Sequence, residues 1–369
     1  MAKLIEEGFS SDFWFPFNTR TLPWFLSPQQ KTQFLDAQKA VISDDLYLEK
    51  DAETGKESRH VYFEASEDSV FKRLALLGRG SFGEVDKVES RVSGRVYARK
   101  RTPRAWIFPI SKASMEVFER ERNSMMKIRH RHCVEFIGSY TTPMFLGILI
   151  SPVAEMNLEE LLSERRNTFP GRSSLLRGFF GCLSSGIRYL HEETKIRHRD
   201  MKPANILIHE GTVKIADFGL SLDWTDGHST TTKGTCPGWS KRYCAPEVAQ
   251  FQPRNSSSDI WSLGCVFLEI VTVLKGQTIS GLLDFLGNDS RGGFGPPYHT
   301  KQQAITAWTR RLMEISDEDN EPIVWVSRML ERVKDERPTA AQLVQYTCHE
   351  GRAPGWLYCG TCCRERIHQ

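Results

Sequence analysis

The sequence lacks the features that mark secreted, membrane-spanning and nucleic-acid-binding chains. Its longest apolar run, 260–274, contains Glu269 and is too short to span a membrane. The first residues carry charges and a proline where a signal peptide would be apolar. The net charge is only +3, from 49 basic and 46 acidic residues, which does not favour nucleic acid or an acidic membrane as a partner. We therefore expect a cytoplasmic or nuclear chain with no membrane span and no nucleic-acid partner.

The cysteines do not have the setting of a disulfide framework. There are nine of them in a chain of 369 residues with no signal peptide, so reduced thiols are expected. Near the C-terminus, Cys359 and Cys362 have the spacing of half a zinc ribbon, with Cys363 beside them. The other half would be Cys348 and His349, which are adjacent rather than spaced. We favour free thiols on a tail and keep Zn²⁺ as the alternative.

Internal repeats are also absent, and the predicted secondary structure changes along the chain from strands to helices. Its size exceeds that of a usual single core, so two lobes or domains are expected. Short alternating apolar runs near 70–100 and at 145–150 predict strands. Helical periods dominate after about 155. We predict helices over these ranges: 28–41, after the capping candidate Ser27, then 112–128, 173–192, 257–274, 299–316, 322–333 and 339–347.

A glycine-rich segment, LGRGSFGEV, occupies residues 77–85. Gly78, Gly80 and Gly83 allow a hairpin whose backbone can lie against phosphates, and Val85 would cover a base from one side. Dinucleotide-binding folds use the same string, but there it is followed by a helix. Here an alternating strand follows, which favours two strands joined by a tight turn. A plain glycine-rich hairpin remains the alternative.

A lysine and a glutamate have the chemistry of a phosphate-binding site. Lys100 ends the apolar strand that begins at Val96, and a predicted helix follows. A lysine that holds phosphates needs a carboxylate to orient its flexible stem. Glu119 and Glu121 both lie on the helix, and we choose Glu121 because it shares the inward face with Phe118 and Met125.

The segment IRHRDMKPANIL, 196–207, has the residue types that phosphoryl transfer to a hydroxyl requires. That chemistry needs a carboxylate to orient and deprotonate the nucleophile, a cation on the moving phosphoryl group and a metal ligand. Asp200, Lys202 and Asn205 supply them in that order. Asp217 follows another predicted strand and offers a second carboxylate for Mg²⁺.

Together with APE at 245–247, these motifs resemble those of eukaryotic-type protein kinases, in order, over about 70–347. The resemblance implies an α+β, bilobal fold. A small antiparallel-sheet N-lobe with one helix would cover about 69–150, and a larger helical C-lobe about 151–347. Residues 1–68 would form an N-terminal extension that packs on or precedes this domain, and 348–369 a cysteine-rich tail. The segments 130–141 and 150–158 further resemble filamentous-fungal kinases.

The resemblance also implies ATP and Mg²⁺ as cofactors, with Asn205 and Asp217 as metal ligands. Adenine would bond to the carbonyl of Ser151 and the backbone of Val153, because Pro152 has no N–H. The remaining residues of the predicted nucleotide site are Leu77, Gly78, Gly80, Ser81, Gly83, Val85, Ala98, Lys100 and Leu207. The resemblance further implies that Asp259 anchors the catalytic loop and that Arg337 pairs with Glu247.

The acceptor is predicted to be a Ser or Thr hydroxyl of a protein, because Lys202 stands where Ser/Thr kinases place a lysine. We expect Ser240 to bridge Asp200 and Lys202. An upstream kinase could act on Thr230, Thr231, Thr232 or Thr235, since Arg199 is suited to pair with a phosphorylated loop. Two alternatives stand beside an active protein kinase. One is a pseudokinase scaffold and the other is a small-molecule phosphotransferase.

Overall fold

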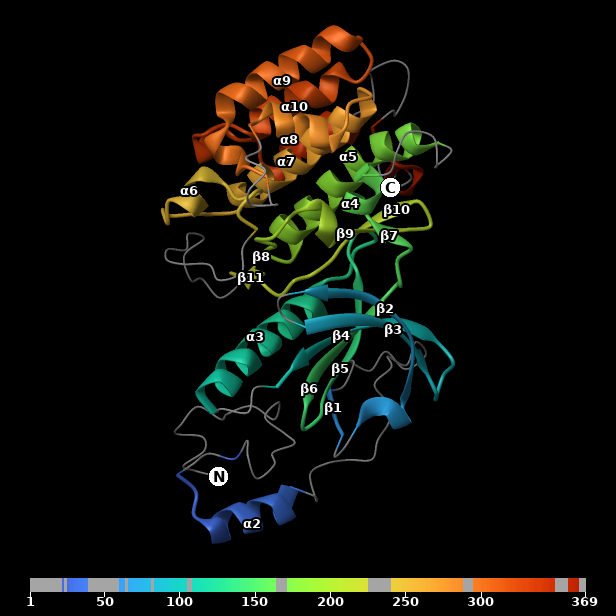
Figure 1. The fold of residues 1–369 in the computed structure, drawn as a ribbon, viewed down its shortest axis with the longest axis vertical. Coiled ribbons are helices and arrows are strands. Elements are labelled where there is room, and N and C mark those ends of the chain that lie inside the picture. Colours follow the sequence, from blue (N-terminus) through green and yellow to red (C-terminus); the bar gives the residue numbers. More distant parts are fainter. Residues whose placement is uncertain are drawn as a thin grey trace. The chain divides into compact units, whose positions relative to one another are not determined.

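The computed structural model describes residues 22, 25–38, 60–63, 66–80, 83–104, 108–163, 171–224, 240–287, 295–348 and 358–364. They belong to two compact units. The first unit comprises Met1–Lys127 and Glu135–Val153, and the second comprises Ile128–Val134 and Ala154–Gln369. The first is rich in strands and the second in helices, so the predicted α+β class is confirmed (Figure 1).

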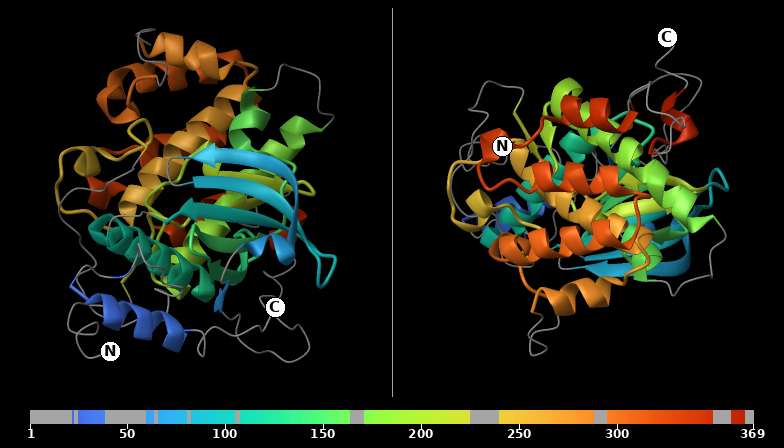
Figure 2. Two further views of the ribbon diagram at one scale, coloured as in Figure 1. Left: turned by 60° about the horizontal axis from the view of Figure 1, so that its bottom comes forward. Right: turned by 90° about the horizontal axis from the view of Figure 1, so that it is seen from above.

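The first unit is built on a six-stranded sheet with the strand order β1-β5-β6-β4-β3-β2. Every neighbouring pair is antiparallel except β1 and β5, which run parallel. One long helix, α3 (Phe108–Lys127), accompanies the sheet (Figures 1 and 2). The strands are β1 (His60–Tyr62), β2 (Phe71–Gly80), β3 (Gly83–Ser90), β4 (Val96–Pro103), β5 (Glu135–Thr141) and β6 (Phe145–Ser151).

Part of the predicted N-terminal extension belongs to this sheet. β1 pairs with β5 in the register His60 to Ser139, and a turn of 3-10 helix, Glu67–Ser69, precedes β2. Earlier in the chain, α2 (Pro28–Gln38) confirms the helix predicted after Ser27. Its start is a capping box, because Ser27 Oγ accepts from Gln30 N (3.2 Å) while Gln30 Oε1 accepts from Ser27 N (2.9 Å). Residues 39–41 of that prediction lie outside the described residues.

A cluster of buried charges, here called the Glu67 network, lies on one face of the sheet. Glu67 Oε1 accepts from Arg99 Nη1 (3.4 Å), Arg101 Nη1 (3.1 Å) and Tyr140 Oη (3.2 Å). Arg99 also forms a two-pronged pair with Asp86, at 3.0 and 2.8 Å. Glu67 is 2% exposed, and Arg99 and Asp86 are completely buried. Successive strand residues face opposite sides of a sheet, so Arg99 and Lys100 project in opposite directions.

The second unit is organised around α7 (Ser257–Leu274), which is buried along most of its length. By length and composition α7 could cross a membrane, yet 78% of it is buried inside the protein, as in the core helix of a folded domain. Figures 1 and 2 show other helices of this unit. They are α4 (Leu158–Ser163), α5 (Arg172–Arg188), α6 (Pro246–Ala249), α8 (Ile279–Phe285), α9 (Gln302–Ile315), α10 (Asn320–Met329), α11 (Ala340–Cys348) and α12 (Thr361–Arg364).

Short paired strands flank the loops of the second unit. β9 (Ile206–His209) forms a hairpin with β10 (Thr212–Ile215), and β7 (Met156–Asn157) pairs with the other side of β9. β8 (Ile196–Arg197) pairs with β11 (Leu222–Asp223). The segment 198–205 therefore runs from one small sheet to the other, and both of its ends are fixed by strand pairing.

A buried carboxyl in α7 predicts how stability depends on pH. Glu269 Oε1 accepts from Tyr243 Oη (2.9 Å) and Tyr298 Oη (2.5 Å). Burial raises the pKa of Glu269 to about 7, although the two hydroxyls oppose the shift. The folded-state pKa thus exceeds the unfolded value, so the contribution of Glu269 is fully present below about pH 4.5 and is lost as pH rises to about 7.

We expect Glu269→Gln to remove this dependence, because the amide keeps an acceptor oxygen and cannot ionise. The free energy of unfolding of wild type should fall between pH 5 and pH 8 while that of the variant does not. The difference, variant minus wild type, should therefore increase by about 2–4 kcal/mol over this range. Urea unfolding at several pH values measures it. Glu314→Gln, at an exposed position of α9, is the control and should leave the wild-type profile unchanged. A Glu269→Gln profile parallel to wild type would contradict the prediction.

Candidate active site

Asp259, in the first turn of α7, holds the backbone of the segment 198–205. Its Oδ1 accepts from Arg199 N (2.8 Å), and its Oδ2 accepts from His198 N (2.9 Å) and pairs with His191 Nε2 (2.8 Å). Burial alone would raise the pKa of Asp259, but the hydrogen bonds, chiefly from His191, lower it below its ordinary value. The ionised carboxylate therefore fixes the loop that carries Asp200.

Two non-glycine residues of this region adopt left-handed backbone conformations. Arg199 has φ 70° and Asp217 has φ 64°. Such conformations cost free energy and persist where surrounding contacts impose them, often at functional sites. At Arg199 the imposing contact is Asp259. Near Asp217, His198 Nε2 contacts Ala216 O at 3.0 Å, and the His198 ring packs edge-on against Phe218.

The two oxygens of Asp200 have different surroundings. Oδ2 accepts from Lys202 Nζ (2.7 Å) and from Asn205 Nδ2 (2.9 Å). Oδ1 is buried and has no hydrogen-bond partner among the described residues. A buried carboxylate oxygen without a donor is costly unless a ligand supplies one. Asp200 is thus held through one oxygen, while the other lacks a donor among the described residues.

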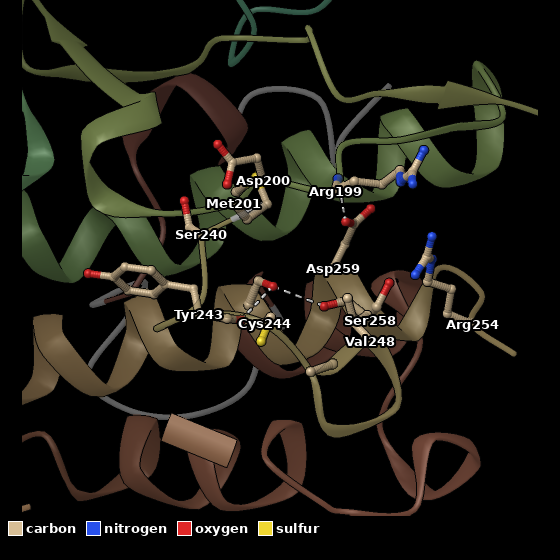
Figure 3. A pocket seen from close by; sticks show the side chains of 12 residues that line it. Arg199, Asp200, Met201, Ser240, Tyr243, Cys244, Val248, Arg254, Ser258 and Asp259 are labelled. Carbon is tan, nitrogen blue, oxygen red and sulfur yellow. Dashed lines mark hydrogen bonds between the residues drawn. The ribbon is translucent and has the colours of Figure 1, made fainter. Parts of the chain in front are cut away.

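Lys202 connects Asp200 to a second segment of the chain. Its Nζ donates to Ser240 Oγ at 2.9 Å as well as to Asp200. Figure 3 shows Asp200 and Ser240 on the same side of a pocket, while Arg199 and Arg254 lie on the other. The structure therefore places Ser240 beside Lys202, with Lys202 between Ser240 and Asp200.

Asn205 and Asp217 are brought together by a backbone hydrogen bond. Ala216 N donates to Asn205 O at 2.9 Å, so the residue preceding Asp217 is held against Asn205. Asn205 Nδ2 also donates to the carbonyl of Asp200 (2.9 Å), which leaves the amide oxygen of Asn205 to act as a metal ligand. A carboxylate and an amide oxygen are the hard donors that Mg²⁺ accepts. The donor set fits the predicted ion.

In the first unit, the structure pairs Lys100 with Glu121 rather than with Glu119. Lys100 Nζ lies 2.6 Å from Glu121 Oε1. Lys100 belongs to β4 and Glu121 to α3, and the Glu121 side chain is buried. A buried carboxylate beside the ammonium restricts the lysine to one direction, as a phosphate-binding lysine requires.

The glycine-rich segment forms the hairpin of β2 and β3, with Gly78 opposite Val85 and Gly80 opposite Gly83. Gly83 has φ 145°, and a Cβ there would lie 1.9 Å from the carbonyl oxygen of Arg101. Only glycine fits this position. At Gly78 a Cβ would meet no atom within 4 Å, so that glycine leaves open space rather than relieving a clash.

The other predicted nucleotide-site residues are distributed between the units. In the first unit, Ala98 is buried in β4 and Leu77 is exposed on β2, while Ser151 ends β6, two residues before Val153. In the second unit, Leu207 is half-buried in β9. Ser81 and the threonines at 230, 231, 232 and 235 lie outside the described residues.

Two further residues, Arg337 and His191, support the site, and only Arg337 was predicted. Arg337 binds Glu247 through two bonds of 2.8 Å, the pair implied by the family resemblance. His191, which completes the bonding of Asp259, was not predicted. A lone histidine at the end of a helical period has no distinctive spacing, so no sequence signal could have selected it.

The comparison with known families agrees with this geometry. The model of the protein kinase domain matches residues 71–348. The chain therefore belongs to the protein kinase family, and the predicted membership of the eukaryotic type is confirmed.

Three relatives illustrate the range of similarity. Mitogen-activated protein kinase kinase kinase YODA of Arabidopsis thaliana is 30% identical over 76% of this chain and 29% of its own length. The mitogen-activated protein kinase kinase kinase MST11 of the fungus Pyricularia oryzae is 30% identical over 61% of this chain and 26% of its own length. Tyrosine-protein kinase SPK-1 of Girardia tigrina is 34% identical over 54% of this chain and 39% of its own length. The chain thus matches well under half of each relative.

Proposed function

We propose that this chain is a protein Ser/Thr kinase that transfers the γ-phosphoryl group of ATP to Ser or Thr hydroxyls of proteins. The observation that carries the proposal is Asp200, which is bonded through Oδ2 to Lys202 and Asn205 while its buried Oδ1 has no partner among the described residues. That oxygen is suited to orient a substrate hydroxyl and accept its proton.

The remaining roles follow from the chemistry of each side chain. Lys202 would place its positive charge on the moving phosphoryl group, and Lys100, oriented by Glu121, would hold the α- and β-phosphates. Asn205 and Asp217 would hold Mg²⁺, which neutralises charge on the phosphates when bound. The backbone of the β2–β3 hairpin would cover the phosphates, since Gly78 and Gly83 carry no side chain.

The acceptor and partners are proposed on two grounds. Lys202, in contact with Ser240, stands where Ser/Thr kinases carry a lysine, which favours an aliphatic hydroxyl. Two of the relatives above are named mitogen-activated protein kinase kinase kinases, which supports another kinase as the protein substrate. Regulation by an upstream kinase at the threonines of 230–235 and a cytoplasmic or nuclear location stay predictions.

The two alternatives predict different site chemistry. A pseudokinase scaffold usually lacks one of the residues equivalent to Lys100, Asp200 and Asp217, and this chain has all three. A small-molecule phosphotransferase generally lacks the later elements, and here Glu247 is bound by Arg337 and Asp259 anchors the loop. Both observations favour the protein kinase.

A transfer assay tests the proposal. Purified chain, Mg²⁺ and γ-labelled ATP are incubated with a generic protein substrate, and the labelled amino acids are identified after hydrolysis. We expect phosphoserine and phosphothreonine from wild type and no detectable label from Lys100→Met or Asp217→Asn, because each removes a phosphate or metal contact.

Lys72→Met is the matched control for Lys100→Met, because Lys72 is an exposed lysine of the same sheet. It should label the substrate as well as wild type does. Dominant phosphotyrosine would refute the acceptor assignment, and label transferred by Asp217→Asn would refute the catalytic assignment. Label on a sugar or choline with none on protein would favour the small-molecule alternative.

A further inference from the structure

Four side chains outside the active site come together in the second unit: His132, Cys182, Cys362 and Cys363. One donor atom from each lies within 4.8 Å of every other. His132 lies in the segment between α3 and β5, Cys182 in α5, and Cys362 and Cys363 in α12. We call this set the Cys3His cluster.

The separations within the cluster suit a single tetrahedral ion. His132 Nε2 lies 3.0 Å from Cys363 Sγ and 3.6 Å from Cys362 Sγ, and Cys182 Sγ lies 3.5 Å from Cys362 Sγ. Zinc bonds of about 2.0–2.3 Å in a tetrahedron place neighbouring donors about 3.5–3.8 Å apart. Two of the three distances fall at this spacing, and the third needs a shift of about half an ångström.

His132 is oriented as a metal-binding histidine. Its Nδ1 lies 3.1 Å from the carbonyl oxygen of Val213 in β10, and donation to that carbonyl places the imidazole proton on Nδ1. Nε2 then carries its lone pair toward the thiols. Ligand histidines commonly have such a carbonyl or carboxylate partner, which fixes the tautomer and the ring.

Glycines let the C-terminal segment approach α5 closely. A Cβ on Gly360 would lie 2.9 Å from Cys182 Sγ, and a Cβ on Gly181 would lie 2.9 Å from Cys359 Sγ. In the middle of α5, Gly181 N donates to Tyr358 O at 2.8 Å. The cysteines expected on a tail are therefore packed against α5. His349, the predicted partner of Cys348 in a zinc knuckle, lies outside the described residues.

Cys348 and Cys359 are a second thiol pair beside the cluster, with 3.1 Å between their sulfurs. Both are buried, whereas Cys362 and Cys363 are half-buried. Cys348, Cys362 and Cys363 border a cavity of about 310 Å³. An ion arriving from solvent could therefore reach the Cys3His cluster directly.

We propose that His132, Cys182, Cys362 and Cys363 bind one Zn²⁺ ion as a structural site. Four protein ligands leave no open position, which is the pattern of structural rather than catalytic zinc. On binding, each cysteine thiol gives its proton to solvent and coordinates as a thiolate, while the neutral imidazole donates through Nε2.

The ion would join the C-terminal segment to the strand that leads to Asp217. The backbone oxygen of His132 accepts from Ile215 N (2.7 Å), and Val134 N donates to Ile215 O (3.0 Å). Ile215 is the last residue of β10, two positions before Asp217. The zinc site would thus tie α5, α12 and β10 together at one point. This inference does not depend on kinase activity.

The test uses the full chain, purified with a reducing agent and dialysed against metal-free buffer. Elemental analysis should find one zinc per chain. X-ray absorption at the zinc edge should give three sulfurs at about 2.3 Å and one nitrogen at about 2.0–2.1 Å. Because this measurement is made on the unaltered protein, it remains decisive if the variants below fail to fold.

Variants identify the ligands. Cys182→Ser and Cys363→Ser should each lower bound zinc at least tenfold under the same dialysis. Cys265→Ala, which removes a buried thiol of α7 outside the cluster, should keep one zinc per chain. A zinc-free wild-type protein, with or without a disulfide between Cys182 and Cys362, would overturn the proposal. It would also fail if Cys182→Ser kept its zinc while Cys359→Ser lost it.

Discussion

Replacing Asp200 by Asn should lower the turnover number about 10²–10⁴-fold, the usual contribution of a positioned general base. The amide can still accept from Lys202 and Asn205 through the oxygen that now holds them, so the loop should keep its conformation. It cannot take up a proton from a substrate hydroxyl. Steady-state phosphorylation of a protein substrate at saturating ATP measures the effect.

The control for this variant is Asp317→Asn, at an exposed position after α9. It makes the same chemical change away from the site, so the turnover number should stay within twofold of wild type. Thermal unfolding of both variants should match wild type within a few degrees. Full activity of Asp200→Asn would remove the carboxylate from the mechanism and with it the main support for the proposed function.

Replacing Glu67 by Ala should lower the free energy of unfolding by about 3–5 kcal/mol, because it leaves buried guanidinium groups with too few carboxylates. Arg99 is fully buried and, among the described residues, would keep only Asp86 as a charged partner, while Arg101 and Tyr140 would lose an acceptor. Denaturant unfolding measures the loss.

Asp68→Ala is the adjacent control for Glu67→Ala, since Asp68 is exposed and carries the same charge. It should cost no more than about 0.5–1 kcal/mol. Equal losses for the two variants would mean that the turn before β2, rather than the buried charge of Glu67, is what matters.

The parts of the fold that could be predicted from the sequence are those in which a helical pattern extends over many residues or a motif is contiguous. The range predicted for α7, 257–274, is the observed helix, because an apolar stretch of that length is too long for an ordinary strand and packs as a buried helix. β1 was not predicted. A three-residue strand has too few residues for a period to register, and its identity depends on β5, more than 70 positions away.

The functional residues likewise fall into those that are close in sequence, which could be predicted, and those that only the fold brings together. Asp200, Lys202 and Asn205 lie within six residues of one another, so their chemistry could be inferred without knowing the fold. The Cys3His cluster could be inferred only in part. Cys362 stood out by its spacing from Cys359, with Cys363 beside it. His132 lies 231 positions from Cys363 and Cys182 lies 180 positions from Cys362, and the packing of α5 brings them together.

β1 and Glu67 precede residue 71, where the match to the protein kinase domain begins. A fragment cut at that boundary would retain every kinase motif identified in the sequence, from the glycine-rich segment onward. It would also expose the outer edge of β5 to pairing with other chains. Within the part of the chain that the structure describes, Arg99 would be left with Asp86 as its one carboxylate partner. The segment that completes the six-stranded sheet therefore begins before the match to the kinase domain. A fragment for expression should start ahead of β1 rather than at residue 71.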